Sequence, residues 1–104
     1  MSGQTPYNAQ ASTLTTTGGQ LPVYDITAAT VIKAAPGRIF RVNVQVAGST
    51  TGTVNDCLTT GTAAIANQVA VIPETVGPLV LEWPCTTGIV VVPGTGQTLS
   101  VSYV

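Results

Sequence analysis

The feature that most constrains the fold of this chain is a set of short segments in which apolar and polar side chains alternate. Residues 38–47 (RIFRVNVQVA) are the clearest example, with an apolar side chain at every second position from Phe40 to Val46. A period of two is typical of a β-strand that turns one face to a core and the other face outward. We therefore expect the intervening residues, such as Arg41 and Asn43, on the outward face.

Residues 98–104 (TLSVSYV) alternate in the same way, and a Gly-rich segment, residues 93–97 (PGTGQ), separates them from the apolar residues 88–92 (GIVVV). This arrangement predicts a β-hairpin with its turn at residues 93–97. A phosphate-binding loop would need a lysine and a helix after the glycines, and this segment has neither. Four shorter runs also have strand character, at residues 30–35, 53–58, 69–72 and 79–83.

About seven short strands thus follow one another at intervals of roughly 8–12 residues, with Gly- and Pro-rich turns between them. The spacing predicts a single all-β domain over residues 21–104, an antiparallel β-sandwich or barrel. No connection has a helical pattern long enough for a parallel βαβ unit, although residues 63–70 permit one helical turn. The residues expected to form the core are Phe40, Val42, Val44, Val46, Leu79, Leu81, Leu99 and Val101.

Residues 1–20 differ from the rest because they are rich in Thr, Ser, Gln, Gly and Asn and follow no apolar period. We interpret them as an extended N-terminal arm that becomes ordered when a partner holds it, with Tyr7 and Leu14 as anchors. An ordinary disordered tail is the alternative. The same residues lack the basic and apolar regions of a secretory signal peptide. No apolar run approaches the ~20 residues of a membrane span, so no membrane partner is expected.

Groups for acid–base chemistry are scarce. The chain has no histidine, three basic residues and four acidic ones, and 7% of its residues are charged, against about one quarter in a typical domain. Nucleophilic catalysis needs a base that is poised near neutral pH. Glu74 and Glu82 are the carboxylates placed best for a glycosidase pair, but a solvated surface is the more common role for such residues. We therefore expect no enzyme and no catalytic residues.

Metal and cofactor sites are not expected either. A zinc site needs four Cys or His ligands, and the chain offers only Cys57 and Cys85. Asn55 and Asp56 alone supply too few oxygen ligands for a calcium loop. Because no export signal is present, we expect synthesis in a cytoplasm, where both cysteines stay reduced as small buried thiols.

The charge balance bears on the partners. A net charge of −1 argues against nucleic acid, which is bound through clustered Lys and Arg. A charge so close to zero also gives little protection against self-association, and three basic residues leave the strand edges little defended. We expect a homo-oligomer, a dimer or a trimer.

Three further residues are candidates for an interface. Trp83, the only tryptophan, is either a core residue, which we favour, or an anchor in a subunit interface. Arg38 and Arg41 lie on either side of Phe40 in the same strand. The outward position of Arg41 suits an intersubunit contact and a solvated surface equally.

Four segments carry a family resemblance: residues 31–38 (VIKAAPGR), 46–49 (VAGS), 83–85 (WPC) and 88–97 (GIVVVPGTGQ). Through them the chain resembles small proteins encoded among the head genes of tailed bacteriophages. The resemblance implies a capsid decoration, or cement, protein: a β-sandwich or jelly-roll-like module that binds the outer capsid surface and stabilises the head. It also implies the major capsid protein as partner and the virion as location, after synthesis in the host cytoplasm.

Two other functions stay open. A tail, collar or host-binding fibre module of the virion would share this composition. A small carbohydrate-binding module would display several aromatic side chains on one face, whereas this chain has five aromatic residues in total (one Trp, three Tyr, one Phe). We expect most of these five to be needed inside the domain.

Overall fold

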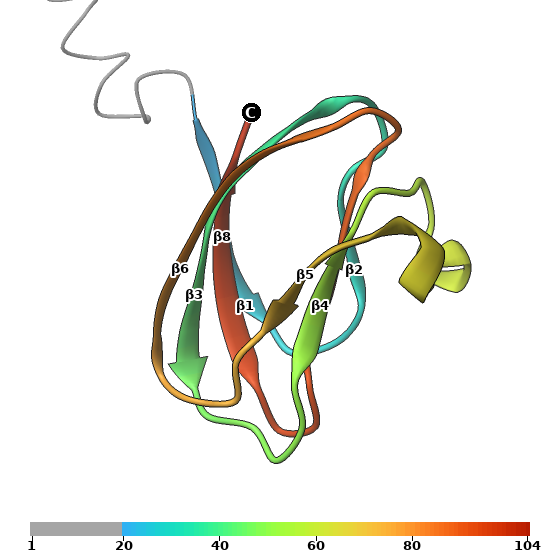
Figure 1. Cartoon of the computed structure of the whole chain (residues 1–104). Helices are drawn as coiled ribbons and strands as arrows, with labels where there is room; N and C mark the ends of the chain where they lie inside the picture. The colour runs from blue at the N-terminus through green and yellow to red at the C-terminus, as the bar shows by residue number, and fades with distance from the viewer. Residues whose placement is uncertain (1–19) are drawn as a thin grey trace, which may run out of the picture.

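Two antiparallel sheets of four strands each make up residues 20–104, the part of the chain that the computed structural model describes (Figure 1). Sheet A has the order β1-β8-β3-β6, and sheet B has the order β2-β7-β4-β5. The strands of sheet A are β1 (Leu21–Ile26), β8 (Thr98–Tyr103), β3 (Gly37–Val46) and β6 (Gly77–Cys85). The strands of sheet B are β2 (Thr30–Lys33), β7 (Ile89–Val92), β4 (Gly52–Asn55) and β5 (Gln68–Ile72).

The strand pairing follows a simple rule. β1 pairs with β8, β2 with β7, β3 with β6 and β4 with β5, and successive pairs alternate between the two sheets. The chain is thus arranged like one long hairpin, with its turn between β4 and β5, that has been rolled up into a sandwich. This arrangement is a jelly roll, so the expected all-β sandwich is confirmed. Residues 1–19, including the proposed arm anchors Tyr7 and Leu14, lie outside the described residues.

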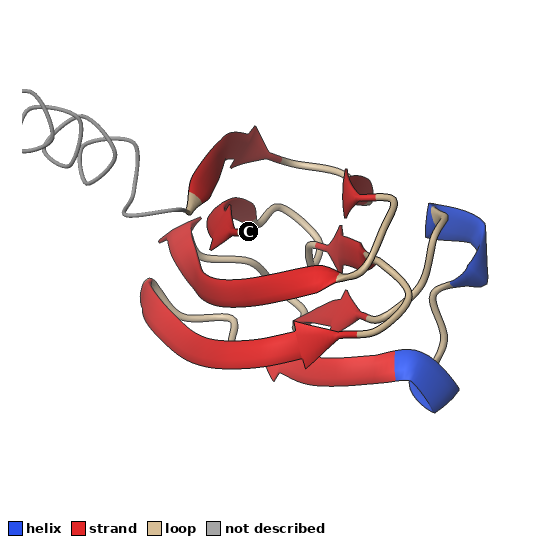
Figure 2. Ribbon diagram, turned by 90° about the horizontal axis from the view of Figure 1, so that it is seen from above, coloured by secondary structure: helices blue, strands red, loops and turns tan. Residues whose placement is uncertain are grey.

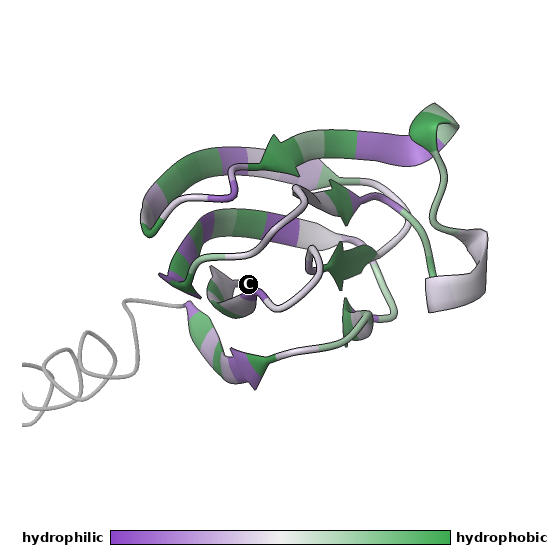
Figure 3. Ribbon diagram, turned by 90° about the horizontal axis from the view of Figure 1, so that it is seen from below, coloured by the Kyte–Doolittle hydropathy of each residue, from purple (hydrophilic) through white to green (hydrophobic). Residues whose placement is uncertain are grey.

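The core lies between the two sheets, where β-branched side chains from both inner faces meet. Figure 3 shows how hydrophobic and hydrophilic residues alternate along the longer strands. Four of the expected core residues are confirmed: Val42, Val44, Leu99 and Val101. Leu79 and Leu81 are partly buried and pack against this cluster. The sequence reasoning did not name the other large contributors, which are Ile26, Ile32, Ile39, Val54, Ile72, Ile89, Val90 and Val91.

Both ends of β3 depart from the expected alternation. Ile39, not Phe40, is fully buried, while Phe40 is half-buried. Between Ile39 and Arg41 the partner strand β8 advances by a single residue, so Phe40 is the extra residue of a β-bulge. A second shift separates Val44 from Val46, which is 50% exposed. The predictions for Phe40 and Val46 are therefore wrong, because each bulge exchanges the faces of the residues beyond it.

The predicted hairpin at residues 93–97 is also wrong. β7 belongs to sheet B and β8 to sheet A, so the connection crosses from one layer to the other. The tight turn itself is present, with the Gln97 N–H donating to the Gly94 carbonyl at 3.1 Å. Gln97 is buried, and its side chain accepts from the Gly94 N–H and donates to the Pro73 carbonyl. These two bonds tie the crossing to the loop between β5 and β6.

Two short 3-10 turns, η1 (Thr60–Thr62) and η2 (Ile65–Asn67), lie between β4 and β5 and project to one side of the sheets (Figure 2). The expected helical turn in residues 63–70 is therefore reduced to η2. Asn55 holds this segment: its amide donates to the Ala64 carbonyl and to the Asn67 side chain, both at 3.0 Å.

Candidate functional site

The acidic residues that were weighed for chemistry are kept apart by the fold. Glu74 lies in the loop after β5, Glu82 lies in β6 close to its far end, and both are exposed. Within residues 20–104, no group of three or more His, Cys, Asp or Glu residues is placed to hold a metal ion.

Asp56 is the most heavily bonded carboxylate of the described chain. It follows β4 and accepts hydrogen bonds from the backbone N–H groups of Thr86, Thr87 and Gly88 at 2.8 to 3.1 Å, and from the Thr86 hydroxyl at 3.1 Å. Burial raises the pKa of Asp56, but these four donors outweigh burial and hold the pKa below its usual value. The carboxylate thus joins β4 to the loop between β6 and β7, which is a structural role.

The two cysteines lie beside this contact. Cys57 follows Asp56, and Cys85 precedes Thr86. Both thiols are buried and neither is in a disulfide, as the sequence predicts. Burial raises the pKa of Cys85 to about 11, with smaller contributions from the negative charges of Asp56 and Cys57.

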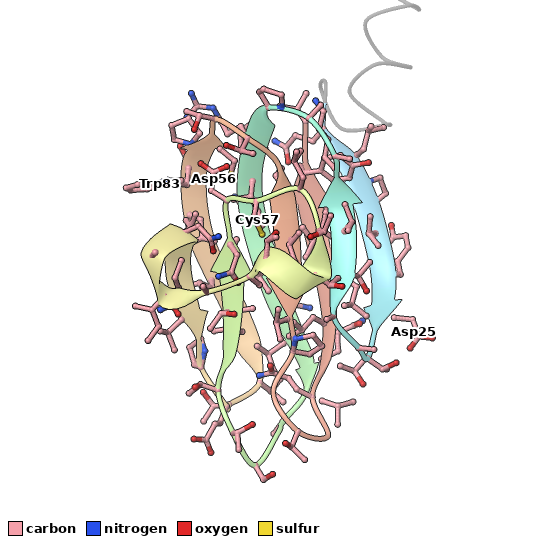
Figure 4. All side chains as sticks on the ribbon, turned by 90° about the vertical axis from the view of Figure 1, so that its right-hand side faces the viewer. Asp25, Asp56, Cys57 and Trp83 are labelled. Atoms are coloured by element: carbon pink, nitrogen blue, oxygen red, sulfur yellow. The ribbon has the colours of Figure 1, made fainter. Side chains whose placement is uncertain are left out.

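Trp83 does not belong to the core, so the favoured interpretation of this residue is wrong. Its side chain is 51% exposed and projects from the edge of β6 (Figure 4). The cause is a bulge in β6: between Ile39 and Arg41 of β3, this strand advances by one residue more than its neighbour. Glu82 sits in the bulge in the left-handed region, with φ of 50°.

Five exposed apolar side chains lie on or next to strands β5 and β6, with Val71 on the outward face of sheet B and Val80 on the outward face of sheet A. These strands are the outermost of sheets B and A, are joined by residues 73–76, and contact one another. Five of the eleven large apolar side chains that are exposed in residues 20–104 lie between residues 65 and 83. We call this set the apolar flank: Ile65 (88% exposed), Val71 (50%), Val76 (64%), Val80 (54%) and Trp83 (51%).

The strand edges are poorly suited to pairing with another chain. Each of the four edge strands holds a bulge, at which it has one residue more than its neighbour. β1 contains Pro22, β6 contains Pro78 and Pro84, and the four-residue β2 contains Lys33. Bulges, prolines and a lysine are devices that block edge-to-edge pairing. The expectation of undefended edges is therefore wrong.

The two arginine candidates lie on sheet A. Arg38 is exposed, and its guanidinium donates to the Glu82 carbonyl at 3.0 Å across to β6. Arg41 is exposed on the outward face, as expected. It lies between two adjoining hollows, the larger of which is also lined by Gln20, Glu82 and Ser102. The structure thus places Arg38 near Trp83 in the β3–β6 pair, and Arg41 at the middle of the sheet.

Sequence reasoning did not find most of the apolar flank. Val71 and Val76 were assigned only to a strand and a loop, and Ile65 to an ambiguous segment. Their exposure depends on β5 and β6 being edge strands, which is a property of the whole topology.

Comparison with protein-family models, with curated proteins and with solved structures found no match to this chain. In the portion from residue 20 onward, no helix is both long and apolar enough to cross a membrane.

Proposed function

We propose that this protein is a non-catalytic structural protein of a virion, a capsid decoration protein that binds the outer surface of the head and stabilises it. The observation that carries the proposal is the apolar flank, an exposed surface on a rigid jelly roll with few charges. Exposed apolar patches on a small domain mark sites of protein contact. The family resemblance described above supplies the identity of the partner, the major capsid protein.

The strength of such a contact can be bounded. Fully burying a large apolar side chain is worth about 1.5–3 kcal/mol, so the five half-exposed residues of the flank supply on the order of 5 kcal/mol. Association costs about 4–15 kcal/mol in lost translational and rotational freedom. One flank alone would therefore bind weakly. A dimer or trimer with several flanks, helped by the N-terminal arm, would bind firmly through multivalency.

The scarcity of charge suits this role. Contacts between apolar groups, hydroxyls and amides change little with ionic strength, whereas exposed charge pairs are screened by salt. Attachment through the apolar flank would therefore persist over the range of salt concentrations that a particle meets. Trp83 is the central residue of this contact in our proposal, since buried tryptophan commonly dominates the energy of an interface.

The test uses heads purified without this protein. Val76→Asp and Trp83→Ala, made together, should weaken binding to such heads by about tenfold or more. Leu21→Ala is the matched control, because Leu21 is 50% exposed but lies on β1, on the opposite side of sheet A. Binding to heads that equals that of the wild type in the double variant would overturn the proposal.

The number of copies per virion separates the head from other locations. A decoration protein is present in proportion to the major capsid protein, whereas a tail, collar or fibre module is present in few copies. Band intensities from purified virions measure this ratio. A low ratio would favour the tail, collar or host-binding fibre alternative.

A further inference from the structure

The outward face of sheet A is a second exposed surface, which meets the apolar flank at Val80. Strand register aligns Pro22, Ser102, Arg41 and Val80 in one row across β1, β8, β3 and β6. A neighbouring row aligns Ser100 with Asn43. Between their ends these rows are polar, whereas Phe40 and Tyr24 add aromatic surface to the same face.

Two adjoining hollows lie on this face and share Arg41 and Ser102. The larger has a volume of about 440 Å³ and reaches Glu82. The smaller has a volume of about 240 Å³ and is bordered by Tyr24 and Asn43. Small-molecule sites in proteins commonly occupy about 300–1,000 Å³, so the joined hollows are large enough for a small ligand.

The polar side chains of this face form no side-chain hydrogen bonds that hold residues 20–104 together. Among the side-chain hydrogen bonds formed within residues 20–104, none involves Tyr24, Arg41, Asn43, Ser100 or Ser102. Elsewhere the fold uses such groups fully, as the amides of the buried Asn55 and Gln97 show. Within the described chain, this face therefore presents an amide, two hydroxyls and a guanidinium that form no side-chain hydrogen bond.

Tyr24 adds an aromatic surface to this set. Its side chain is 71% exposed, the most exposed aromatic residue of the described chain. The expectation that most aromatic residues are needed inside is wrong for Tyr24 and Trp83, so the argument against sugar binding loses its basis. A flat ring beside paired donors and acceptors matches the two sides of a sugar ring, which has an apolar C–H face and a rim of hydroxyls.

From these observations we propose that the outward face of sheet A binds an uncharged oligosaccharide. Tyr24 stacks against one sugar ring, while Asn43 and Ser100 bond to its hydroxyls. Arg41 donates to the next ring in the larger hollow, where the Glu82 carboxylate accepts. One cation and one anion leave the site neutral, so a phosphorylated or sulfated ligand, which requires several cations, is disfavoured. The site lies outside the apolar flank, and its existence does not depend on the proposed function.

The test is an NMR titration of the full chain with neutral trisaccharides of glucose, galactose, mannose, rhamnose and N-acetylglucosamine, and in parallel with acidic trisaccharides. At least one neutral trisaccharide should shift backbone amide signals of β1, β3 and β8, with a dissociation constant on the order of 1 mM or lower. Tyr24→Ala and Asn43→Ala should each weaken this binding by about tenfold, whereas Tyr24→Phe should retain it. Val71→Ala is the matched control on the apolar flank.

Three results would overturn the proposal. The first is that no trisaccharide shifts these signals. The second is that only acidic sugars do so. The third is that the signals move with protein concentration instead, which would make the face a contact between copies. Binding to heads separates this site from the proposed function: Tyr24→Ala should leave head binding intact, and Trp83→Ala should leave sugar binding intact.

Discussion

Asp56 shows how one of four acidic residues is used to hold the fold. Its carboxylate accepts three backbone N–H groups and a hydroxyl from the loop between β6 and β7. An amide in its place would accept some of these bonds but would turn its own NH₂ group toward N–H donors. Hydrogen bonds to charged groups contribute about 1.5–3 kcal/mol. We therefore predict that Asp56→Asn lowers the free energy of unfolding at pH 7 by about 1–3 kcal/mol.

The pH dependence follows from the lowered pKa of Asp56. The stabilisation is complete above the usual pKa of 3.8 and is lost as the pH falls through the lower pKa of the folded state. The difference in unfolding free energy between the wild type and Asp56→Asn should consequently narrow below pH 3.8. Urea unfolding at several pH values measures this free-energy difference. The control is Glu74→Gln, because Glu74 is exposed. A constant difference across this range would contradict the assignment.

Cys85 offers a second prediction at this scale. With its pKa raised to about 11 by burial and by nearby negative charge, the thiol is almost entirely protonated at pH 8. The thiolate is the reactive form, and the side chain is 3% exposed. Cys85 should therefore resist iodoacetamide in the native protein at pH 8 and react in guanidinium chloride, as mass spectrometry can show. Rapid labelling of the native protein would mean that the loop around Cys85 opens readily.

At the scale of the elements, alternation located strands well but could not locate bulges. Residues 98–104 and the middle of β3 behave as predicted because the inner face there is regular. Phe40, Val46 and Trp83 were assigned to the wrong environment because each lies at or beyond a bulge. A bulge adds one residue without a distinctive sequence signal, and it exchanges the faces beyond it. The local pattern therefore could not show it.

The hairpin predicted at residues 93–97 was wrong for a different reason. Its glycines and proline correctly indicate a tight turn, but the same residues serve a hairpin and a crossing between sheets equally well. The deciding feature is Gln97, whose side chain reaches Pro73 in a loop distant in sequence. The apolar flank was missed on similar grounds, since only the strand order makes β5 and β6 edge strands.

Gln97→Ala tests this account of the crossing. The substitution leaves the Gly94 N–H and the Pro73 carbonyl without their side-chain partner. A buried polar group that loses its partner costs about 1–3 kcal/mol. Gly94 is buried whereas Pro73 is exposed, so the free energy of unfolding should fall by about 1–3 kcal/mol. Chemical denaturation measures this, with the exposed Gln45→Ala as control. A loss no larger than that of the control would show that solvent or backbone movement replaces both bonds.

At the scale of the whole molecule, exposed side chains are the means of contact that residues 20–104 offer, and the proposed arm would add to them. The four edges are interrupted by bulges, and the two ends of the sandwich are tied by internal hydrogen bonds. All sheet pairing and the whole described core lie within residues 20–104. Residues 1–19 precede the edge strand β1 directly. Since β1 is an edge strand of sheet A, our proposal is that the arm extends from this edge toward a neighbouring capsid subunit.

Deletion of residues 2–19 tests the arm as part of the proposed decoration function. The truncated protein should keep its fold and thermal unfolding midpoint. Ordering a segment costs about 1–2 kcal/mol per residue in backbone entropy, so an arm that stays bound must make contacts that exceed this cost. Binding to undecorated heads should therefore weaken by about tenfold or more, which corresponds to at least ~1.4 kcal/mol.

A full-length variant with Tyr7→Ala and Leu14→Ala distinguishes the contribution of the two proposed anchors from that of the rest of the arm. It keeps every residue position of the arm and removes only the two large apolar side chains. If these groups are the anchors, the variant should lose most of the affinity that the deletion loses. If the deleted protein instead saturates undecorated heads at the affinity of the wild type, residues 1–19 are a tail without a role in attachment, and the apolar flank must supply the whole of the binding.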